Sequence, residues 1–119
     1  KLLQIMGNLL SNARHALREK EQGPRELTVR LRVLPAGFFA IDVEDTGAGI
    51  SAESLKRLFE FGFTTKKEGH GFGLHASANL AKEMGGELGG RSEGVNRGAC
   101  FTVRLPVAAA EAEPQRRSA

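Results

Sequence analysis

Residues 27–49 read LTVRLRVLPAGFFAIDVEDTGAG, and this stretch decides the fold class. Apolar and polar residues alternate over residues 27–33, which is typical of a half-buried strand. Pro35-Ala36-Gly37 predicts a hairpin connection, and the alternation resumes in a second strand over residues 38–44. Continuing that alternation places Asp45 on the core-side face. A carboxylate there is costly unless it has a partner, so Asp45 is a candidate functional residue.

Periodicity on both sides of this hairpin predicts the other elements. They are a helix over 1–19, a short helix with Ser51 as N-cap that ends near Leu58, a helix from about Phe72 to Met84, and strands at about 87–92 and 99–105. This order predicts an α+β fold, a two-layer α/β sandwich whose mixed, mostly antiparallel sheet has helices on one face. We expect residues 1–106 to form the domain and residues 107–119 to form a flexible C-terminal tail.

The composition is that of an ordinary folded domain. Of the 119 residues, 40% are hydrophobic and 26% are charged, which suits a single core, and no apolar run is long enough to span a membrane. The chain begins inside a helical pattern without Met, so we expect it to be a piece of a longer protein. One cysteine, Cys100, excludes an internal disulfide and a multi-cysteine zinc site and favours the cytoplasm. The net charge of +3 comes from scattered residues without Tyr or Trp, which disfavours nucleic-acid binding.

Asn8 and Asn12 lie four residues apart on the first predicted helix, so their side chains share one face. An amide oxygen is a hard ligand that suits Mg²⁺ beside phosphate groups. The alternative is that both amides only cap or bridge parts of the fold.

The run Asp45-Thr46-Gly47-Ala48-Gly49-Ile50 follows a predicted strand. A buried carboxylate can accept a hydrogen bond from an exocyclic amine such as N6 of adenine. The two glycines let the backbone turn beneath a flat ring. The alternative is a simple turn after an edge strand, with Asp as the turn former.

The run Gly69-His70-Gly71-Phe72-Gly73-Leu74 leads into a helix, whose free N-terminal amides and dipole attract phosphate. It follows a long loop, residues 59–71, that is typical of a lid. It does not follow the first strand of a βαβ unit, which argues against a dinucleotide-binding Rossmann domain, and the chain has no P-loop sequence. Lys66 and Lys67 in this loop could screen phosphate charge or form a solvated pair.

These motifs, in this order, resemble the ATP-binding domain of histidine kinases, within the superfamily that includes gyrase, heat-shock chaperone and mismatch-repair ATPases. The resemblance spans residues 1–106 and implies a Bergerat ATP-binding fold that here lacks the family's first strand. The matching segments are the N box at 8–13, the G1 box at 45–49, the F box at 59–66, the G2 box at 69–74 and a closing strand from 98 to 106.

The resemblance implies ATP and Mg²⁺ as ligands. It assigns Asn12 to Mg²⁺, Asp45 to adenine, and the G2 amides with the lid to the phosphates, and either Arg14 or His15 faces phosphate. The catalytic candidates are Asn8, Asn12 and Lys66, and Asn12 is the metal ligand. The nucleotide-binding candidates are Asn12, His15, Asp45, Gly47, Gly49, Ile50, Phe59, Thr65, Lys66, Gly69, His70, Gly71, Phe72, Gly73 and Leu74.

Three departures from the family pattern refine this expectation. Asn8 stands where relatives that hydrolyse ATP carry Glu, and Asn cannot act as a general base, which favours phosphoryl transfer over hydrolysis. Ala99 replaces a Thr often found beside adenine. No histidine is followed by the acidic residue of the family's phosphoacceptor motif, since His15 and His75 precede Ala and His70 precedes Gly. We therefore expect no autophosphorylation site in this chain.

The sequence thus predicts the ATP-binding domain of a two-component sensor histidine kinase. It would donate the γ-phosphate of ATP to a His on a separate dimerisation domain of a homodimeric parent protein, with or without a membrane anchor. A response regulator receiver domain is the expected partner. The alternatives are a hydrolytic ATPase of the same superfamily and a binding module that has lost nucleotide affinity.

Overall fold

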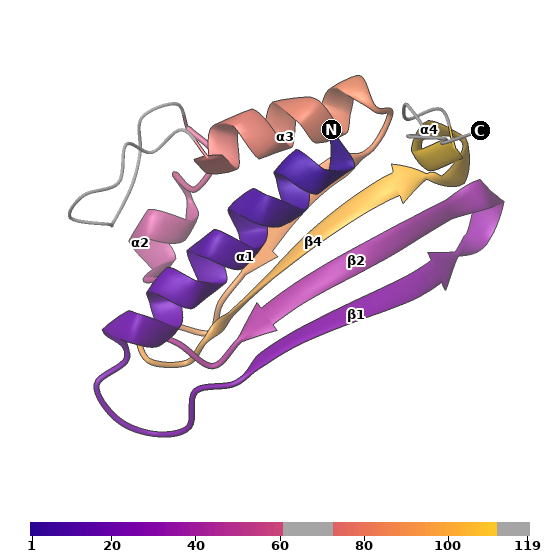
Figure 1. Ribbon diagram of the computed structural model, residues 1–119. Helices are drawn as coiled ribbons and strands as arrows, with labels where there is room; N and C mark the ends of the chain where they lie inside the picture. The colour runs from indigo at the N-terminus through magenta and orange to yellow at the C-terminus, as the bar shows by residue number, and fades with distance from the viewer. Residues whose placement is uncertain (61–72, 112–119) are drawn as a thin grey trace.

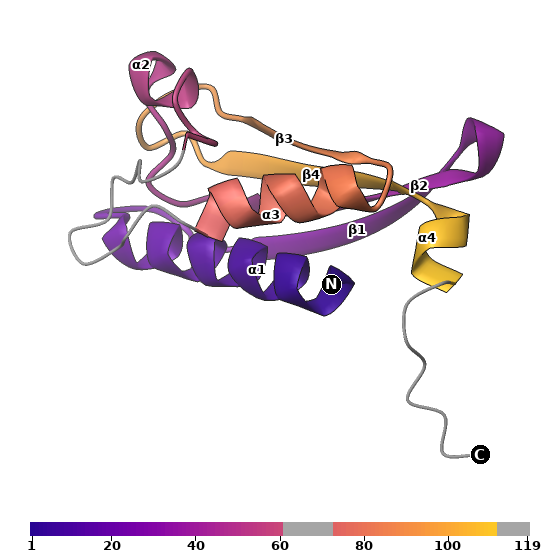
Figure 2. The ribbon, with the colours of Figure 1, turned by 90° about the horizontal axis from the view of Figure 1, so that it is seen from above.

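The computed structural model describes residues 1–60 and 73–111, which form two layers (Figure 1). One layer is a four-stranded sheet with the order β1-β2-β4-β3, in which all neighbouring strands are antiparallel. Helices α1 and α3 lie side by side over one face of the sheet (Figure 2). The predicted α+β sandwich is confirmed. The elements are α1 (Leu2–Glu19), β1 (Leu27–Leu34), the 3-10 turn η1 (Pro35–Gly37), β2 (Phe38–Asp45), α2 (Ala52–Leu55), α3 (Gly73–Glu83), β3 (Glu87–Arg91), β4 (Ala99–Pro106) and α4 (Val107–Glu111).

Helix α1 forms and docks because its apolar residues share one face. Ile5, Leu9 and Ala13 follow one another at four-residue spacing, and all three are buried. They pack in one core with Val43 of β2 and Phe101 of β4. Burying a side chain such as Leu9 contributes roughly 1.5–3 kcal/mol, so this stripe holds α1 on the sheet. The helix predicted over residues 1–19 is confirmed.

Helix α3 ends next to the two glycines predicted to stop it. The amide of Gly85 donates to the carbonyl of Lys82 at 3.0 Å, and the amide of Gly86 donates to the carbonyl of Ala81 at 2.8 Å. These two bonds satisfy carbonyl groups at the helix end that have no partner within the helix. The chain then turns back into β3 at the far edge of the sheet.

Helix α2 is shorter than predicted. Its N-cap is Ser51, as expected, and the Ser51 hydroxyl accepts a hydrogen bond from the amide of Ser54 at 3.1 Å. The helix ends at Leu55, and the chain continues in tighter turns, in which the amide of Arg57 donates to the carbonyl of Ser54. Leu58 beyond these turns is buried in the core.

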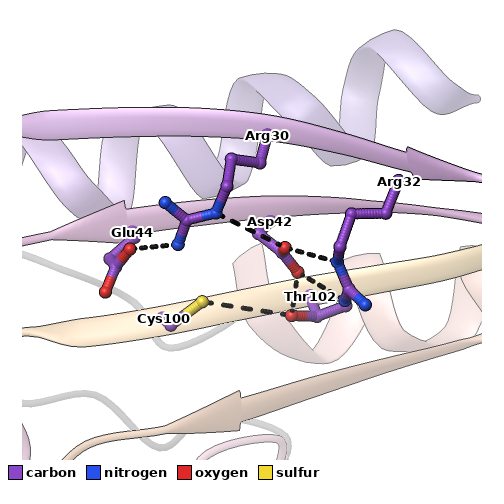
Figure 3. A network of polar contacts seen from close by, with 6 residues as sticks. All are labelled: Arg30, Arg32, Asp42, Glu44, Cys100 and Thr102. Atoms are coloured by element: carbon purple, nitrogen blue, oxygen red, sulfur yellow. Dashed lines mark hydrogen bonds and ion pairs between the residues drawn. The ribbon is translucent and has the colours of Figure 1, made fainter.

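The face of the sheet opposite α1 and α3 carries a polar network (Figure 3). Asp42 of β2 lies at its centre and is only 6% exposed. Arg32 of β1 donates to both Asp42 carboxylate oxygens, at 2.7 and 2.9 Å, and the Thr102 hydroxyl of β4 donates to Oδ1 at 2.6 Å. Arg30 pairs with Glu44 and lies 3.9 Å from Asp42. Strand pairing brings these residues together, and sequence reasoning did not single them out.

The first residues after β4 differ from the prediction. Residues Val107–Glu111 form α4, whereas a flexible tail was expected from residue 107. Three consecutive alanines lie within α4, and Ala has the highest helix propensity. A tail over residues 112–119 stays a prediction, because these residues lie outside the described ranges. Within residues 1–60 and 73–111, no helix combines the length and the hydropathy needed to cross a bilayer.

Candidate functional site

The predicted functional residues that the structure describes gather toward one end of the molecule. This end holds the C-terminal end of β2, the later turns of α1, α2 and the start of α3 (Figure 1). Asn8 of α1 contacts the first residue of α3, and Ala16 of α1 contacts the turn that follows β2. Motifs that are far apart in the sequence are therefore neighbours in the fold.

Asp45 is the last residue of β2 and is 3% exposed, on the core side as alternation predicted. Its Oδ1 accepts a hydrogen bond from the amide of Gly47 at 2.8 Å. Its Oδ2 is buried and has no hydrogen-bond partner among the described residues. Burial raises the pKa of the Asp45 carboxyl, although the backbone amides of Gly47 and Ala99 favour the ionised form. A buried, half-satisfied carboxylate is costly, and it is a strong acceptor for a donor group of a ligand.

The turn at residues 45–50 packs directly on α1. The amide of Ala48 donates to the carbonyl of Ala16 at 2.9 Å. A Cβ atom added to Gly47 would lie 2.6 Å from both the carbonyl carbon and the carbonyl oxygen of Ala16, closer than side-chain atoms approach. The close approach of the helix backbone therefore requires glycine at residue 47. The expectation that the two glycines let the chain turn beneath a flat ring stays a prediction.

The loop at residues 92–98, between β3 and β4, lies against the other side of this turn. Gly49 has a φ of +73°, and a Cβ atom there would lie 2.1 Å from the carbonyl oxygen of Gly94. The amide of Asn96 donates to the carbonyl of Ala48 at 2.6 Å. Both the left-handed backbone and the contact with the loop require glycine at residue 49.

Ser92 is a neighbour of this turn that sequence reasoning missed. Its hydroxyl accepts a hydrogen bond from the amide of Ile50 at 3.0 Å and donates to the carbonyl of Gly98 at 2.6 Å. It thereby links the end of β3 to the end of the turn. The sequence placed Ser92 at the end of the strand predicted at about 87–92, whereas β3 ends at Arg91.

Thr46 ties the same turn to the loop at residues 20–26. Its hydroxyl donates to the carbonyl of Pro24 at 2.8 Å and accepts from the amide of Glu26 at 2.9 Å. The ammonium group of Lys20 donates to the carbonyl of Thr46. The charge of Lys20 also lowers the pKa of Asp45, but burial outweighs this effect. The turn is thus fixed from three sides.

Asn8 connects α1 to α3. Its Nδ2 donates to the hydroxyl of Ser77 at 2.8 Å and to the carbonyl of Gly73 at 3.2 Å. Ser77 is fully buried, and a Cβ atom on Gly73 would lie 3.7 Å from the Asn8 side chain. The bridging role that the sequence left open for the Asn8 amide is therefore present, and it holds the first turn of α3.

Asn12 and His15 follow Asn8 at helical spacing along α1, and both are half-buried. The Asn12 amide makes no side-chain hydrogen bond with the described residues, so both of its polar atoms can serve a ligand. The Nε2 atom of His15 is buried and lacks a hydrogen-bond partner in the described part of the chain, and it lies 3.7 Å from Oε2 of Glu19. The two side chains offer an amide oxygen and an imidazole beside Ala16 and the turn.

The remaining predicted residues divide into two groups. Ile50, Phe59 and Leu74 are partly buried and pack against the core, and Gly73 begins α3. The other predicted residues lie outside the described ranges, so their roles stay predictions. They are Thr65, Lys66, Gly69, His70, Gly71 and Phe72.

The described residues offer a buried acceptor for a donor group of a ligand. Asp45 offers a buried acceptor at the end of β2. The backbone of the turn beside it is held in place by α1 and the loop at residues 92–98, so the acceptor is preorganised. Asn12 supplies the oxygen type that magnesium prefers, on the helix that borders this turn.

The family model for histidine kinase-, DNA gyrase B- and HSP90-like ATPases matches residues 1–109. Two-component sensor PprA of Pseudomonas aeruginosa is 44% identical over 114 residues, which cover 92% of this chain and 12% of PprA. Sensor histidine kinase ZraS of Klebsiella oxytoca is 36% identical over 107 residues, which cover 90% of this chain and 22% of ZraS.

The fold also matches solved structures. Full-length ShkA, crystallised in complex with AMPPNP, superposes with a TM-score of 0.67 at 31% identity, over 88% of this chain and 21% of ShkA. The chain therefore spans between 12% and 22% of the length of these three relatives.

Proposed function

The chain belongs to the histidine kinase-, DNA gyrase B- and HSP90-like ATPase family, and from this premise we propose that it is the ATP-binding catalytic domain of a two-component sensor histidine kinase. It binds ATP with Mg²⁺ and presents the γ-phosphate to a histidine on a separate dimerisation domain of its parent protein. The two curated relatives named above are a two-component sensor and a sensor histidine kinase, which supports the kinase over other members of the family.

One observation carries this proposal, namely the buried Oδ2 of Asp45 without a partner among the described residues. An anionic acceptor pairs with the exocyclic amine of adenine, whereas guanine presents a carbonyl oxygen at the same edge of the ring. Burial excludes competing water, so the charge-assisted hydrogen bond is strong. ShkA, a relative of the same fold, was crystallised with the nucleotide analogue AMPPNP.

The metal and the phosphates would bind on the α1 side of Asp45. Asn12 would hold Mg²⁺ through its amide oxygen, and the ion would supply charge neutralisation at the phosphate oxygens. As the family resemblance implies, His15, Lys66 and the amides of Gly69, Gly71 and Gly73 would bind the phosphates. The protein's contribution to transfer is positioning and charge stabilisation, since phosphoryl transfer needs little covalent chemistry from the enzyme.

Asn8 supports transfer over hydrolysis. A water-activating base must accept a proton, and an amide has no basic site at neutral pH. The Nδ2 atom of Asn8 also holds Ser77 and Gly73, so this side chain serves the start of α3. Asn8 therefore supports catalysis by organising the site, and the phosphate passes to a protein acceptor.

The rest of the system lies in the parent protein. We propose that the parent is a homodimer whose dimerisation domain carries the phosphoacceptor histidine, and that a response regulator receiver domain takes the phosphate from it. This domain works in the cytoplasm, where ATP and the receiver domain are available.

Titration calorimetry of the chain with ADP, with and without Mg²⁺, tests the proposal. We expect micromolar to millimolar binding that prefers adenine to guanine nucleotides, and little steady release of phosphate from ATP. Asp45→Asn should weaken ADP binding by about tenfold or more and reduce the preference for adenine. Asn12→Ala should weaken binding more in the presence of Mg²⁺ than in its absence.

Glu44→Gln is the matched control, because Glu44 neighbours Asp45 in β2 and points to the opposite face. It should bind ADP like the original chain. If the chain binds no nucleotide at millimolar concentration, the proposal is wrong. Rapid steady ATP hydrolysis that Asp45→Asn abolishes would favour the hydrolytic ATPase instead.

A further inference from the structure

The side chain of His75 bridges α3 and the chain that follows α2. Its Nδ1 lies 3.0 Å from the carbonyl oxygen of Phe59, and its Nε2 lies 3.2 Å from Nδ2 of Asn79. Asn79 is one helical turn further along α3, so both ring nitrogens of a half-buried histidine have defined partners. The sequence raised His75 only as a phosphoacceptor, and rejected it.

The two contacts fit one tautomer of the ring. A backbone carbonyl can only accept, so Nδ1 must carry the proton that points to Phe59. In the neutral ring, Nε2 is then an acceptor, and it takes a hydrogen bond from the amide nitrogen of Asn79. Asn79 therefore favours the tautomer that His75 needs in order to hold Phe59.

The bridge ties the chain that follows α2 to the first turn of α3. His75 lies two residues after Gly73, the first residue of α3. The Phe59 ring packs against the core, and its carbonyl is held by His75. The carbonyl of Gly73 is in turn held by Asn8. The backbone at Phe59 is thus tied to α3, and the first residue of α3 is tied to α1, in each case through a carbonyl group bound by a side chain.

We propose that His75 is a positioning residue of the nucleotide site, which acts through the Phe59 carbonyl in the Nδ1-protonated form that Asn79 selects. This inference rests on the proposed function and on the role in nucleotide binding that the family resemblance implies for Phe59. By fixing Phe59 before the nucleotide arrives, His75 lowers the ordering cost of binding.

Two substitutions separate the donor at Nδ1 from the rest of the ring. Asn places its amide nitrogen near the position of Nδ1, whereas Gln places it near the position of Nε2. His75→Asn should therefore keep the bond to Phe59, and His75→Gln should lose it. By calorimetry with Mg-ADP, we expect His75→Asn to stay close to the original affinity and His75→Gln to bind about tenfold more weakly, as for one lost hydrogen bond. Equal affinities of the two variants would overturn the proposal.

A second measurement does not depend on nucleotide or on the stability of the His75 variants. Long-range ¹⁵N–¹H correlation spectra of the nucleotide-free chain report which ring nitrogen carries the proton. We expect a protonated Nδ1 for His75, and a shift toward protonated Nε2 in Asn79→Ala, a change at an exposed position. A ring protonated only at Nε2 in the original chain would overturn the bridge.

Together, calorimetry and the ¹⁵N–¹H spectra distinguish a failure of this inference from a failure of the proposed function. If the original chain binds no Mg-ADP, the proposed function fails and the positioning role fails with it, even where the spectra show the bridge. If the chain binds Mg-ADP and the His75 variants do not differ, only the role of His75 fails.

Discussion

At the scale of single residues, β2 carries two buried carboxylates on opposite faces. Asp42 is bound by Arg32 and Thr102, and the hydrogen bonds from Arg32 hold its pKa below the ordinary value. Asp45, three residues later, has one oxygen without a partner in the described chain, and burial holds its pKa above the ordinary value. The paired carboxylate stabilises the sheet, and the unpaired one is available to a ligand.

Asp45→Asn should make the nucleotide-free chain more stable. At neutral pH the neutral amide avoids burying a carboxylate that has one oxygen without a partner among the described residues, and we expect a gain of about 1 kcal/mol in the free energy of unfolding. Because the folded pKa of Asp45 is raised, the penalty of the carboxylate is complete above that pKa and disappears as the pH falls below the unfolded value. Urea unfolding at several pH values measures this difference. A variant that is less stable than the original chain at neutral pH would contradict the unpaired state of Asp45.

Asp42→Asn should destabilise the chain. The loss of two charge-assisted bonds to a half-exposed Arg32 should cost about 1–2 kcal/mol at neutral pH. The folded pKa of Asp42 is lowered, so its contribution is complete above the unfolded pKa and is lost as the pH falls through the folded pKa. The difference between the two proteins should therefore shrink in acid.

Glu44→Gln serves as the matched control for Asp42, since Glu44 lies on the same face of β2 and is 42% exposed. Its loss should change the unfolding free energy by less than about 0.5 kcal/mol, as is usual for surface ion pairs. Equal losses of unfolding free energy in Asp42→Asn and Glu44→Gln would mean that the burial of Asp42 does not contribute to stability.

At the scale of elements, the turn at residues 45–50 is held between α1 and the loop at residues 92–98. Gly49→Ala should cost more than about 2 kcal/mol of stability, because it combines a left-handed φ with a Cβ 2.1 Å from the Gly94 oxygen. Gly7→Ala is the control: Gly7 is exposed within α1, and a Cβ there meets nothing within 4 Å. It should add about 1 kcal/mol through helix propensity. Thermal unfolding of both variants checks the contrast, and a harmless Gly49→Ala would argue against close packing of the turn.

The sequence predicts most of these elements because their signals are local. Apolar spacing marks α1, alternation marks β2 and the side on which Asp45 lies, and the hydroxyl of Ser51 marks the start of α2. The end of α2 could not be predicted, because the burial of Leu58 depends on the core.

Most of the residues that form hydrogen bonds with the site residues could not be predicted from the sequence. Ser92, Ser77 and Lys20 contact the motifs only because distant segments meet in the fold, and no periodic pattern encodes such a meeting. The role of His75 was missed for the same reason, since its neighbour Phe59 belongs to another motif.

At the scale of the whole molecule, the turn at residues 45–50 has a consequence for the folding route. Its backbone bonds to residue 16 in α1 and to residue 96 just before β4, so it closes two long stretches of chain at once. Closing long loops costs chain entropy before the contacts reward it, so we expect these contacts to form late in folding. Asp45 therefore reaches its final surroundings only when the early and late segments have both docked. A partly synthesised or cleaved chain would hold no weakened version of the pocket, so affinity for nucleotide should appear all at once with completion of the fold.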